Sequence, residues 1–152
     1  MTTPAHREAV RVLARLARLL ERSTGELSLA HYRVLAAISQ GDQRASRLAE
    51  RLALGRPAIS AAVESLSARG LLERRAVEGD ARGSSLSLTT AGRQLLDQVE
   101  TAAAAGLAAV IARTADPDAT LAALTALGPA VEQAAAERYA TRSARPDDGG
   151  RA

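Results

Sequence analysis

The sequence predicts a mainly α-helical fold that contains one β-hairpin, and three observations support this prediction. Apolar residues recur at helical spacing over most of the 152 residues. Residues 72–77 and 84–89 instead favour two short strands, because Leu86 and Leu88 alternate with small polar residues. With 2 Tyr, 1 Met and no Phe or Trp, the core must consist of Leu, Ala, Val and Ile, which suits closely packed helices.

Two helices are expected in the first 40 residues. Residues 4–23 carry apolar residues on one face and arginines on another, which is the pattern of an amphipathic helix ending near Gly25. Ser28 is a good N-cap for a second helix over residues 29–39, and Gly41 ends it.

The next two helices form a tight pair. Residues 45–52 predict a two-turn helix, and residues 56–69 predict a longer one with Pro57 in its first turn, where a missing N–H costs nothing. Gly70 is expected to cap the second helix. Two helices joined by a short, glycine-containing turn make a helix-turn-helix.

A hairpin and two further helices complete the predicted chain. The polar, glycine-bracketed residues 78–83 are expected to be the loop of the hairpin, which makes it a wing. A long helix is expected from Thr90 to about residue 113, and Asp116 with Pro117 starts a last helix that Gly128 and Pro129 are expected to break or kink.

These elements predict a winged helix-turn-helix with a helical region on either side of it in the sequence. Residues 28–89 are assigned to the winged helix-turn-helix. Residues 1–27 and 90–140 are assigned to a helical dimerisation region, because their apolar and Ala-rich faces exceed what one small winged domain can cover. Residues 141–152 are rich in Arg, Pro, Asp and Gly and are expected to form a disordered tail.

Composition argues against several classes of function. The chain has no Cys and only 2 His, His6 and His31, so neither thiol chemistry nor a structural zinc site is expected. It has no triad motif, no phosphate-binding glycine loop and no paired acids that suggest a cleft, so an enzyme is not expected, and neither is a cofactor. No run of about 20 apolar residues is present, so we expect a soluble, cytoplasmic protein.

The second helix of the helix-turn-helix carries the predicted contacts to DNA bases. Its apolar residues Ile59, Val63 and Leu66 must pack inward, so the opposite, N-terminal face is free to enter a major groove. That face consists of small residues apart from Arg56, which can pair with guanine. The DNA-reading candidates are Arg56, Pro57, Ala58, Ser60 and Ala61. The alternative is an exposed polar helix face that has no partner.

The wing supplies further candidates. Arg82 near its tip, with Arg74 and Arg75 on the first strand, can straddle the DNA backbone and reach the minor groove, while Asp80 is expected to hold the loop by pairing with an arginine. All 20 basic residues of the chain are arginines. Residues 44–82 hold eight of them against five acids, so the net charge of +3 lies in this segment.

Residues 27–96 resemble the MarR family of bacterial regulators. The most specific parts are LAERLALGRPAISAAVESLSARGLLER at residues 48–74, the wing pattern Asp80-x-Arg82, and Leu86-x-Leu88-Thr89-x-x-Gly92. The resemblance implies an obligate dimer built from the first, fifth and sixth helices, which represses promoters and is often released by small, frequently phenolic anions. The family often has Arg or Lys where Ala61 stands, which makes Arg56 more important here.

The expected function is that of a homodimeric transcription regulator that binds a specific, pseudo-palindromic sequence in double-stranded DNA, and the resemblance implies that it acts as a repressor. A small aromatic or anionic effector is expected to bind between the dimerising helices and the winged domain, where Arg11, Arg15, Arg18, His31 and Tyr32 can converge. Alternatively, the arginines form a solvated face and Tyr32 is a core residue. The alternative function is a winged-helix protein-interaction module or antirepressor without a ligand. A metal-sensing winged helix needs ligand clusters that this sequence lacks.

Overall fold

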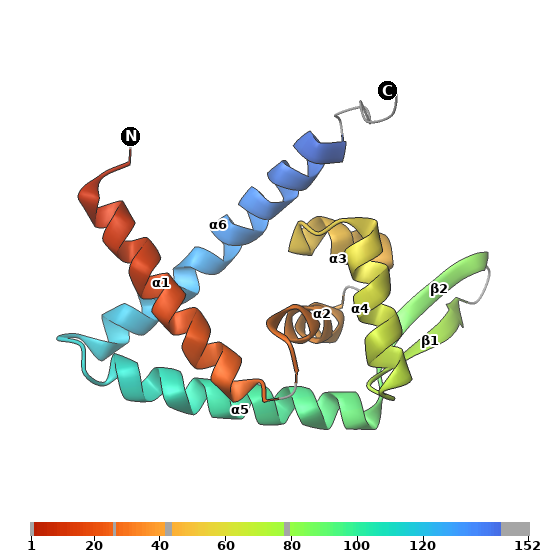
Figure 1. The fold of residues 1–152 in the computed structure, drawn as a ribbon, viewed down its shortest axis with the longest axis horizontal. Helices are drawn as coiled ribbons and strands as arrows, with labels where there is room; N and C mark the ends of the chain where they lie inside the picture. The colour runs from red at the N-terminus through yellow and green to blue at the C-terminus, as the bar shows by residue number, and fades with distance from the viewer. Residues whose placement is uncertain (1, 26, 42–43, 78–79, 144–152) are drawn as a thin grey trace, which may run out of the picture.

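The fold is mainly helical and has one antiparallel hairpin, as predicted (Figure 1). The computed structural model describes residues 2–25, 27–41, 44–77 and 80–143, with the backbone alone at residues 76, 77, 80–84 and 143. The helix-turn-helix and the hairpin lie at one end of the molecule, and α1 crosses α6 at the other (Figure 1). Helix α5 runs along one edge and connects the two ends.

The first two helices begin and end where the sequence places them. Helix α1 spans Pro4–Ser23 and α2 spans Leu29–Ser39. The side chains of Thr3 and Ser28 cap them by accepting hydrogen bonds from the backbone N–H groups of His6 and His31. These caps satisfy N–H groups that have no partner within the helix.

The helix-turn-helix consists of α3 (Ala45–Leu52) and α4 (Arg56–Ala68). The turn between them depends on Ala53, which adopts the left-handed conformation with φ of 51°. Gly70, with φ of 68°, ends α4 in a Schellman motif: its N–H donates to the Ser67 carbonyl, and the Leu71 N–H donates to the Leu66 carbonyl.

The wing consists of β1 (Leu72–Val77) and β2 (Asp80–Leu88). Leu72 pairs with Leu88 and Arg74 with Leu86, but the register shifts between Ala76 and Val77. The prediction that residues 78–83 form a loop is therefore wrong for residues 80–83, which belong to β2. Ser84 pairs with Ala76 and Asp80 with Val77, so the pairing of β2 with β1 steps across residues 81–83 at the register shift.

Of the last two helices, the fifth agrees closely with the prediction and the sixth is longer than predicted. Helix α5 spans Thr90–Ile111, ends slightly before the predicted end near residue 113, and is capped by Thr89. Helix α6 spans Pro117–Ser143 and continues through Pro129, so the expected break at this proline is wrong. It also includes Thr141, where the tail was expected to begin; residues 144–152 lie outside the described part of the chain.

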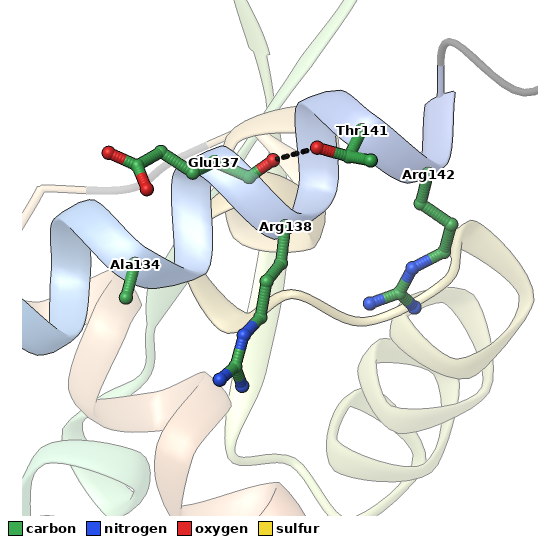
Figure 2. Close-up of a pocket in the computed structure, with 5 residues that line it drawn as sticks. All are labelled: Ala134, Glu137, Arg138, Thr141 and Arg142. Carbon is green, nitrogen blue, oxygen red and sulfur yellow. Dashed lines mark hydrogen bonds between the residues drawn. The ribbon is translucent and has the colours of Figure 1, made fainter. Parts of the chain in front are cut away.

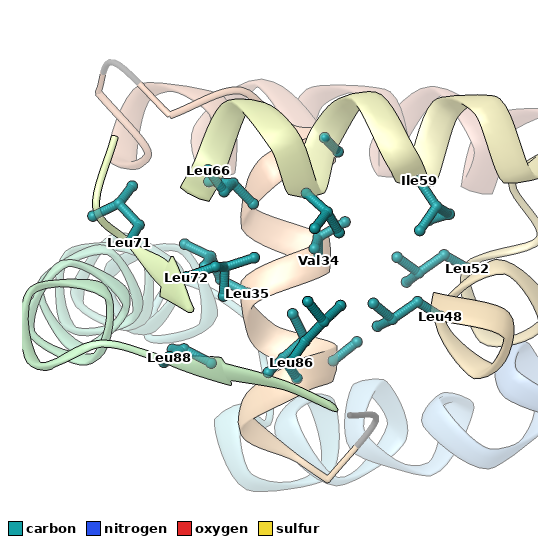
Figure 3. Packing of buried hydrophobic residues seen from close by; sticks show 14 of the residues in the cluster. Val34, Leu35, Leu48, Leu52, Ile59, Leu66, Leu71, Leu72, Leu86 and Leu88 are labelled. Carbon is teal, nitrogen blue, oxygen red and sulfur yellow. The ribbon is translucent and has the colours of Figure 1, made fainter. Parts of the chain in front are cut away.

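The core lies between the helix-turn-helix, α2, the wing and the start of α5 (Figure 3). Val34 and Leu35 from α2, Leu48 from α3, and Leu66 from α4 are fully buried. Leu86 and Leu88 of β2 close the cluster from the wing side (Figure 3). The core therefore fixes the orientation of α4, whose opposite face stays outside.

The outer helices are far less buried than the winged helix-turn-helix. In the described part of the chain, no residue of α1 or α6 is buried. Large apolar side chains stand exposed on them and on the far end of α5: Val10, Val12, Leu13, Val110, Leu121, Leu127 and Val131. Helix α1 packs on α5 at a close crossing, where a Cβ added to Gly106 would lie 3.1 Å from Leu19. None of the described helices has the length and apolar character that crossing a membrane requires.

Candidate nucleic-acid interface

Helix α4 has one buried and one exposed face, divided as the sequence predicted. Ile59, Val63 and Leu66 are at most 1% exposed. The predicted DNA-reading residues Arg56, Pro57, Ala58, Ser60 and Ala61 are all exposed. The structure thus brings these five side chains together on the first two turns of one helix, over a face that the core holds in place.

The start of α4 is the most open part of this face. Arg56 lies at its first position and forms no hydrogen bond or ion pair within the described part of the chain. A hollow of about 270 Å³ lies between the first turns of α3 and α4 and is lined by Ala45, Ser46, Arg56, Ile59 and Ser60. Unpaired backbone N–H groups at a helix N-terminus favour an anion, so this end suits a phosphate or an electronegative base edge.

Arg74 and Arg75 of β1 lie on opposite faces of the hairpin. Arg74 pairs with Leu86, so it lies on the face that continues from the core, whereas Arg75 pairs with Ser85 on the other face. Both side chains are exposed. The side chains of Asp80 and Arg82 lie outside the described residues, and the backbone places both in β2.

Arg75 has a partner within the wing. Its Nε donates to Glu73 at 2.9 Å, and Ser87 donates to the same carboxylate at 3.1 Å. The hydrogen bonds from Arg75 and Ser87 hold the pKa of Glu73 below its usual 4.5. Since Arg74 has no such partner in the described part of the chain, it is the freer of the two arginines for contact with phosphate.

Side chains from outside the helix-turn-helix hold its turn. Arg33 of α2 donates to the Leu52 carbonyl, and Arg142 of α6 donates to the Ala53 carbonyl, each at 3.1 Å. Arg51 of α3 forms an ion pair of 2.9 Å with Glu132 of α6. Figure 2 shows Arg142 extending from α6 toward the helix-turn-helix. The C-terminal half of α6 is therefore bound to α3 and to the turn that follows α3.

The residues predicted to bind an effector do not gather in one place. Arg11 and Arg15 both pair with Glu8 on the exposed face of α1, at 3.1 and 3.0 Å. Burial and the charge of Arg69 hold the pKa of His31 below its usual 6.5. The positive charge of Arg69, at the C-terminal end of α4, thus disfavours protonation of the His31 ring.

Tyr32 lines a separate hollow of about 310 Å³ between α1, α2 and α5. The other residues around it are Leu19, Leu20, Glu100, Ala103, Ala104 and Leu107. Burial, the charge of Glu100 and a hydrogen bond to that carboxylate raise the pKa of Tyr32 above its ordinary 10.0. None of the four basic side chains expected beside Tyr32 lines this hollow.

Sequence reasoning missed the acidic member of this hollow. Glu100, Ala103, Ala104 and Leu107 recur at helical spacing on α5, which marks one face of that helix. This helical spacing can be seen in the sequence. A helix face can be assigned to a cavity, however, only when the helices that lie opposite it are known.

Comparison with known proteins agrees with this architecture. Residues 26–83, which run from just before α2 into the wing, match the model of the MarR family. Over these residues the chain is similar to the MarR family. No curated protein sequence matches the chain closely enough to be compared with it.

Solved structures extend the MarR likeness beyond the winged helix. Wild-type apo MarR from E. coli is 25% identical and superposes with a TM-score of 0.69 over 82% of this chain and 96% of its own. The Mycobacterium tuberculosis MarR family protein Rv2887, in complex with salicylic acid, is 24% identical, with a TM-score of 0.67 over 84% of this chain and 98% of its own. The transcriptional repressor CouR, bound to a 23-mer DNA duplex, is 23% identical, with a TM-score of 0.70 over 84% of this chain and 91% of its own.

Proposed function

We propose that this MarR-type chain is a transcription regulator, acting as a repressor, that binds a pseudo-palindromic site in double-stranded DNA as a homodimer. The observation that carries the proposal is the exposed, N-terminal face of α4. Arg56 has no partner there in the described part of the chain, and the other exposed side chains of this face are small. A helix that enters the major groove requires such a face, because bulky side chains hold it away from the base edges. The DNA complex of CouR supports this mode of binding for the fold.

The contacts divide into those that read bases and those that hold the backbone. Arg56 pairs with a guanine edge, Ala58 contacts a thymine methyl group, and Ser60 bonds a base or a phosphate. In the wing, Arg74 and Arg82 contact phosphates or the minor groove, where they add affinity more than sequence preference. Arg75 contributes less, because Glu73 competes for its guanidinium group.

The homodimer is supported by the apolar surface of the outer helices. Val10 and Val131 are each 63% exposed, and five further large apolar residues on α1, α5 and α6 are at least 42% exposed. Large apolar side chains exposed in this number on one set of helices favour an interface between two chains. A two-fold axis through these helices would place the two α4 helices about 34 Å apart, one turn of DNA.

The dimer is tested by sedimentation of the purified protein. We expect the mass of two chains, and we expect Val10→Glu combined with Val131→Glu to shift the protein toward one chain at micromolar concentration. Both side chains are exposed within a single chain, so circular dichroism should still report the helical fold. A parent protein that sediments as one chain would refute the dimer.

DNA binding is tested by selecting sequences from a random duplex library and titrating the selected site at two salt concentrations. We expect an inverted repeat bound by two chains. Arg56→Ala should relax the base preference within each half-site, whereas Arg82→Ala should weaken binding to all sequences and lower the salt dependence. Arg22→Ala, which removes an exposed arginine from α1, is the matched control and should bind like the parent.

The same titration distinguishes the proposal from its rival. Affinity that falls steeply with salt and depends on sequence supports the regulator. If no sequence is enriched and the weak binding that remains depends on salt alone, the regulator is refuted and the exposed face of α4 is free to bind a protein.

A further inference from the structure

The hollow around Tyr32 has a chemical character opposite to that expected of the family. Its described lining residues include two groups that can ionise, Glu100 and Tyr32, and both of them are acids. No arginine or histidine is among them, since Arg11 and Arg15 are bound to Glu8. An aromatic carboxylate placed here would meet the Glu100 carboxylate without a cation to balance it.

The remaining walls are apolar. Leu19 and Leu20 from α1 face Ala103, Ala104 and Leu107 from α5, and the ring of Tyr32 closes the α2 side. Glu100 is exposed and therefore lies at the rim of the hollow, whereas Tyr32 is half-buried. A volume of about 310 Å³ is at the lower end of small-molecule sites and accommodates one ring with a short chain.

Glu100 has no cationic partner among the residues that the structure describes. The ion pairs of the described residues involve Glu8, Glu73 and Glu132, and none involves Glu100. Its carboxylate hydrogen-bonds Tyr32, which leaves further acceptor positions for a donor from solvent. The rim thus offers a negative charge beside an aromatic face, and both groups attract an ammonium ion.

We propose that this hollow binds an organic amine with an apolar body, whose ammonium group pairs with Glu100 and whose carbon skeleton lies between α1 and α5. The assignment of this amine as an effector rests on the proposed function, because only a DNA-binding protein has an affinity for the ligand to change. The binding itself does not depend on that function. An amine that binds one arrangement of α1, α2 and α5 better than another shifts the population of the regulator by that difference in affinity.

The test uses three probes with the same carbon skeleton and different charge: 4-phenylbutylamine, 4-phenylbutanol and 4-phenylbutyrate. Titration calorimetry on the full-length protein should give the order amine, alcohol, carboxylate, with the amine at least about tenfold tighter than the carboxylate. Glu100→Gln keeps the shape and removes the charge, so it should weaken the amine about tenfold and strengthen the carboxylate. Glu64→Gln, on the exposed face of α4, is the matched control and should change neither.

A second variant tests the cavity apart from the charge. Ala103→Leu fills the hollow and should abolish binding of both the amine and the alcohol, while thermal unfolding shows that the variant is folded. Equal binding of the three probes, or an amine affinity that Glu100→Gln leaves unchanged, would overturn the proposal. So would binding that survives Ala103→Leu in a folded protein.

Titrating the selected DNA site with and without the amine separates this inference from the proposed function. A protein that binds the amine through Glu100 but enriches no DNA sequence keeps the amine site and loses the regulator. A protein that binds its DNA site but prefers the carboxylate keeps the regulator and loses the amine site. If both bind and the DNA affinity is unchanged by saturating amine, the role of the amine as an effector is refuted.

Discussion

Replacing Gly92 by alanine should destabilise the protein, although alanine is the better helix former. Gly92 is buried in the first turn of α5, where the chain passes the root of the wing. A Cβ at this position would lie 2.1 Å from the carbonyl oxygen of Leu71, well short of the 3.4 Å at which ordinary van der Waals contact begins. The obstacle is backbone, so no rotamer change relieves it.

The cost follows from what must move. Leu71 is buried, and its carbonyl accepts a hydrogen bond of 3.1 Å from the Thr89 N–H. Displacing that carbonyl costs about 1–3 kcal/mol for overpacking and about 1 kcal/mol for the weakened hydrogen bond. Alanine returns up to about 1 kcal/mol through its higher helix propensity. An approach of 2.1 Å to backbone places the overpacking cost in the upper part of its range, and the gain in helix propensity offsets the weakened hydrogen bond. We therefore expect a net loss of roughly 2–3 kcal/mol in the free energy of unfolding.

Urea and thermal unfolding of Gly92→Ala, followed by circular dichroism at fixed protein concentration, measure this loss. The midpoint of thermal unfolding should fall by roughly 4–12 °C. Gly128→Ala is the matched control, because a Cβ there meets no atom within 4 Å apart from its chain neighbours and the residue lies in the middle of α6. It should change stability by no more than about 1 kcal/mol, because the higher helix propensity of alanine is opposed by contact of its Cβ with the ring of Pro129. If Gly92→Ala is as stable as the parent, the close approach of α5 to the wing is not part of the folded protein and the reasoning is refuted.

Three further perturbations have definite signs. Thr89→Val removes both the cap to the Gly92 N–H at 3.0 Å and the hydrogen bond to the Gly70 carbonyl at 2.6 Å, so urea unfolding should show a loss of about 1–2 kcal/mol. The folded-state pKa of Glu73 lies below its usual 4.5, so its contribution to stability is present above about pH 4.5 and is lost as the pH falls through the folded pKa. In a carboxyl NMR titration, Arg75→Gln should raise that pKa, and an unchanged midpoint would contradict the ion pair. The folded-state pKa of His31 lies below 6.5, so the stability due to its neutral ring is present above pH 6.5 and is lost as the pH falls through the folded pKa. Arg69→Gln should raise the His31 pKa only partly, because burial is the larger cause; a ring NMR titration that shows no change would exclude the contribution of Arg69.

Local signals in the sequence were enough to place most helices. Ser28 caps α2, and Gly70 ends α4 in the left-handed conformation that favours glycine. The inward and outward faces of α4 follow from apolar spacing alone, so the residues predicted to read DNA could be placed on its exposed face. Each of these features depends on residues that lie within about one helical turn of one another in the sequence.

Features decided by distant parts of the chain were not predictable in the same way. Ala53 takes a left-handed conformation that is uncommon for a residue with a side chain, and its carbonyl accepts a hydrogen bond from Arg142, 89 positions away. The β2 strand begins at Asp80 because β1 lies beside it, although its own residues look like a loop. The acidic hollow forms only when Glu100 of α5 comes to lie beside Tyr32 of α2.

The contacts between α3 and α6 attach the winged helix to the outer helices at a place separate from α5, on which α2 and β2 also pack. Each attachment at a separate place further limits how the winged helix can turn relative to the outer helices. In the proposed dimer, this restricts the distance between the two recognition helices. The DNA affinity of such a protein depends on the length of the spacer between its half-sites as well as on their sequence. A variant without the Arg51–Glu132 ion pair would bind sites with shorter and longer spacers that the parent protein binds weakly.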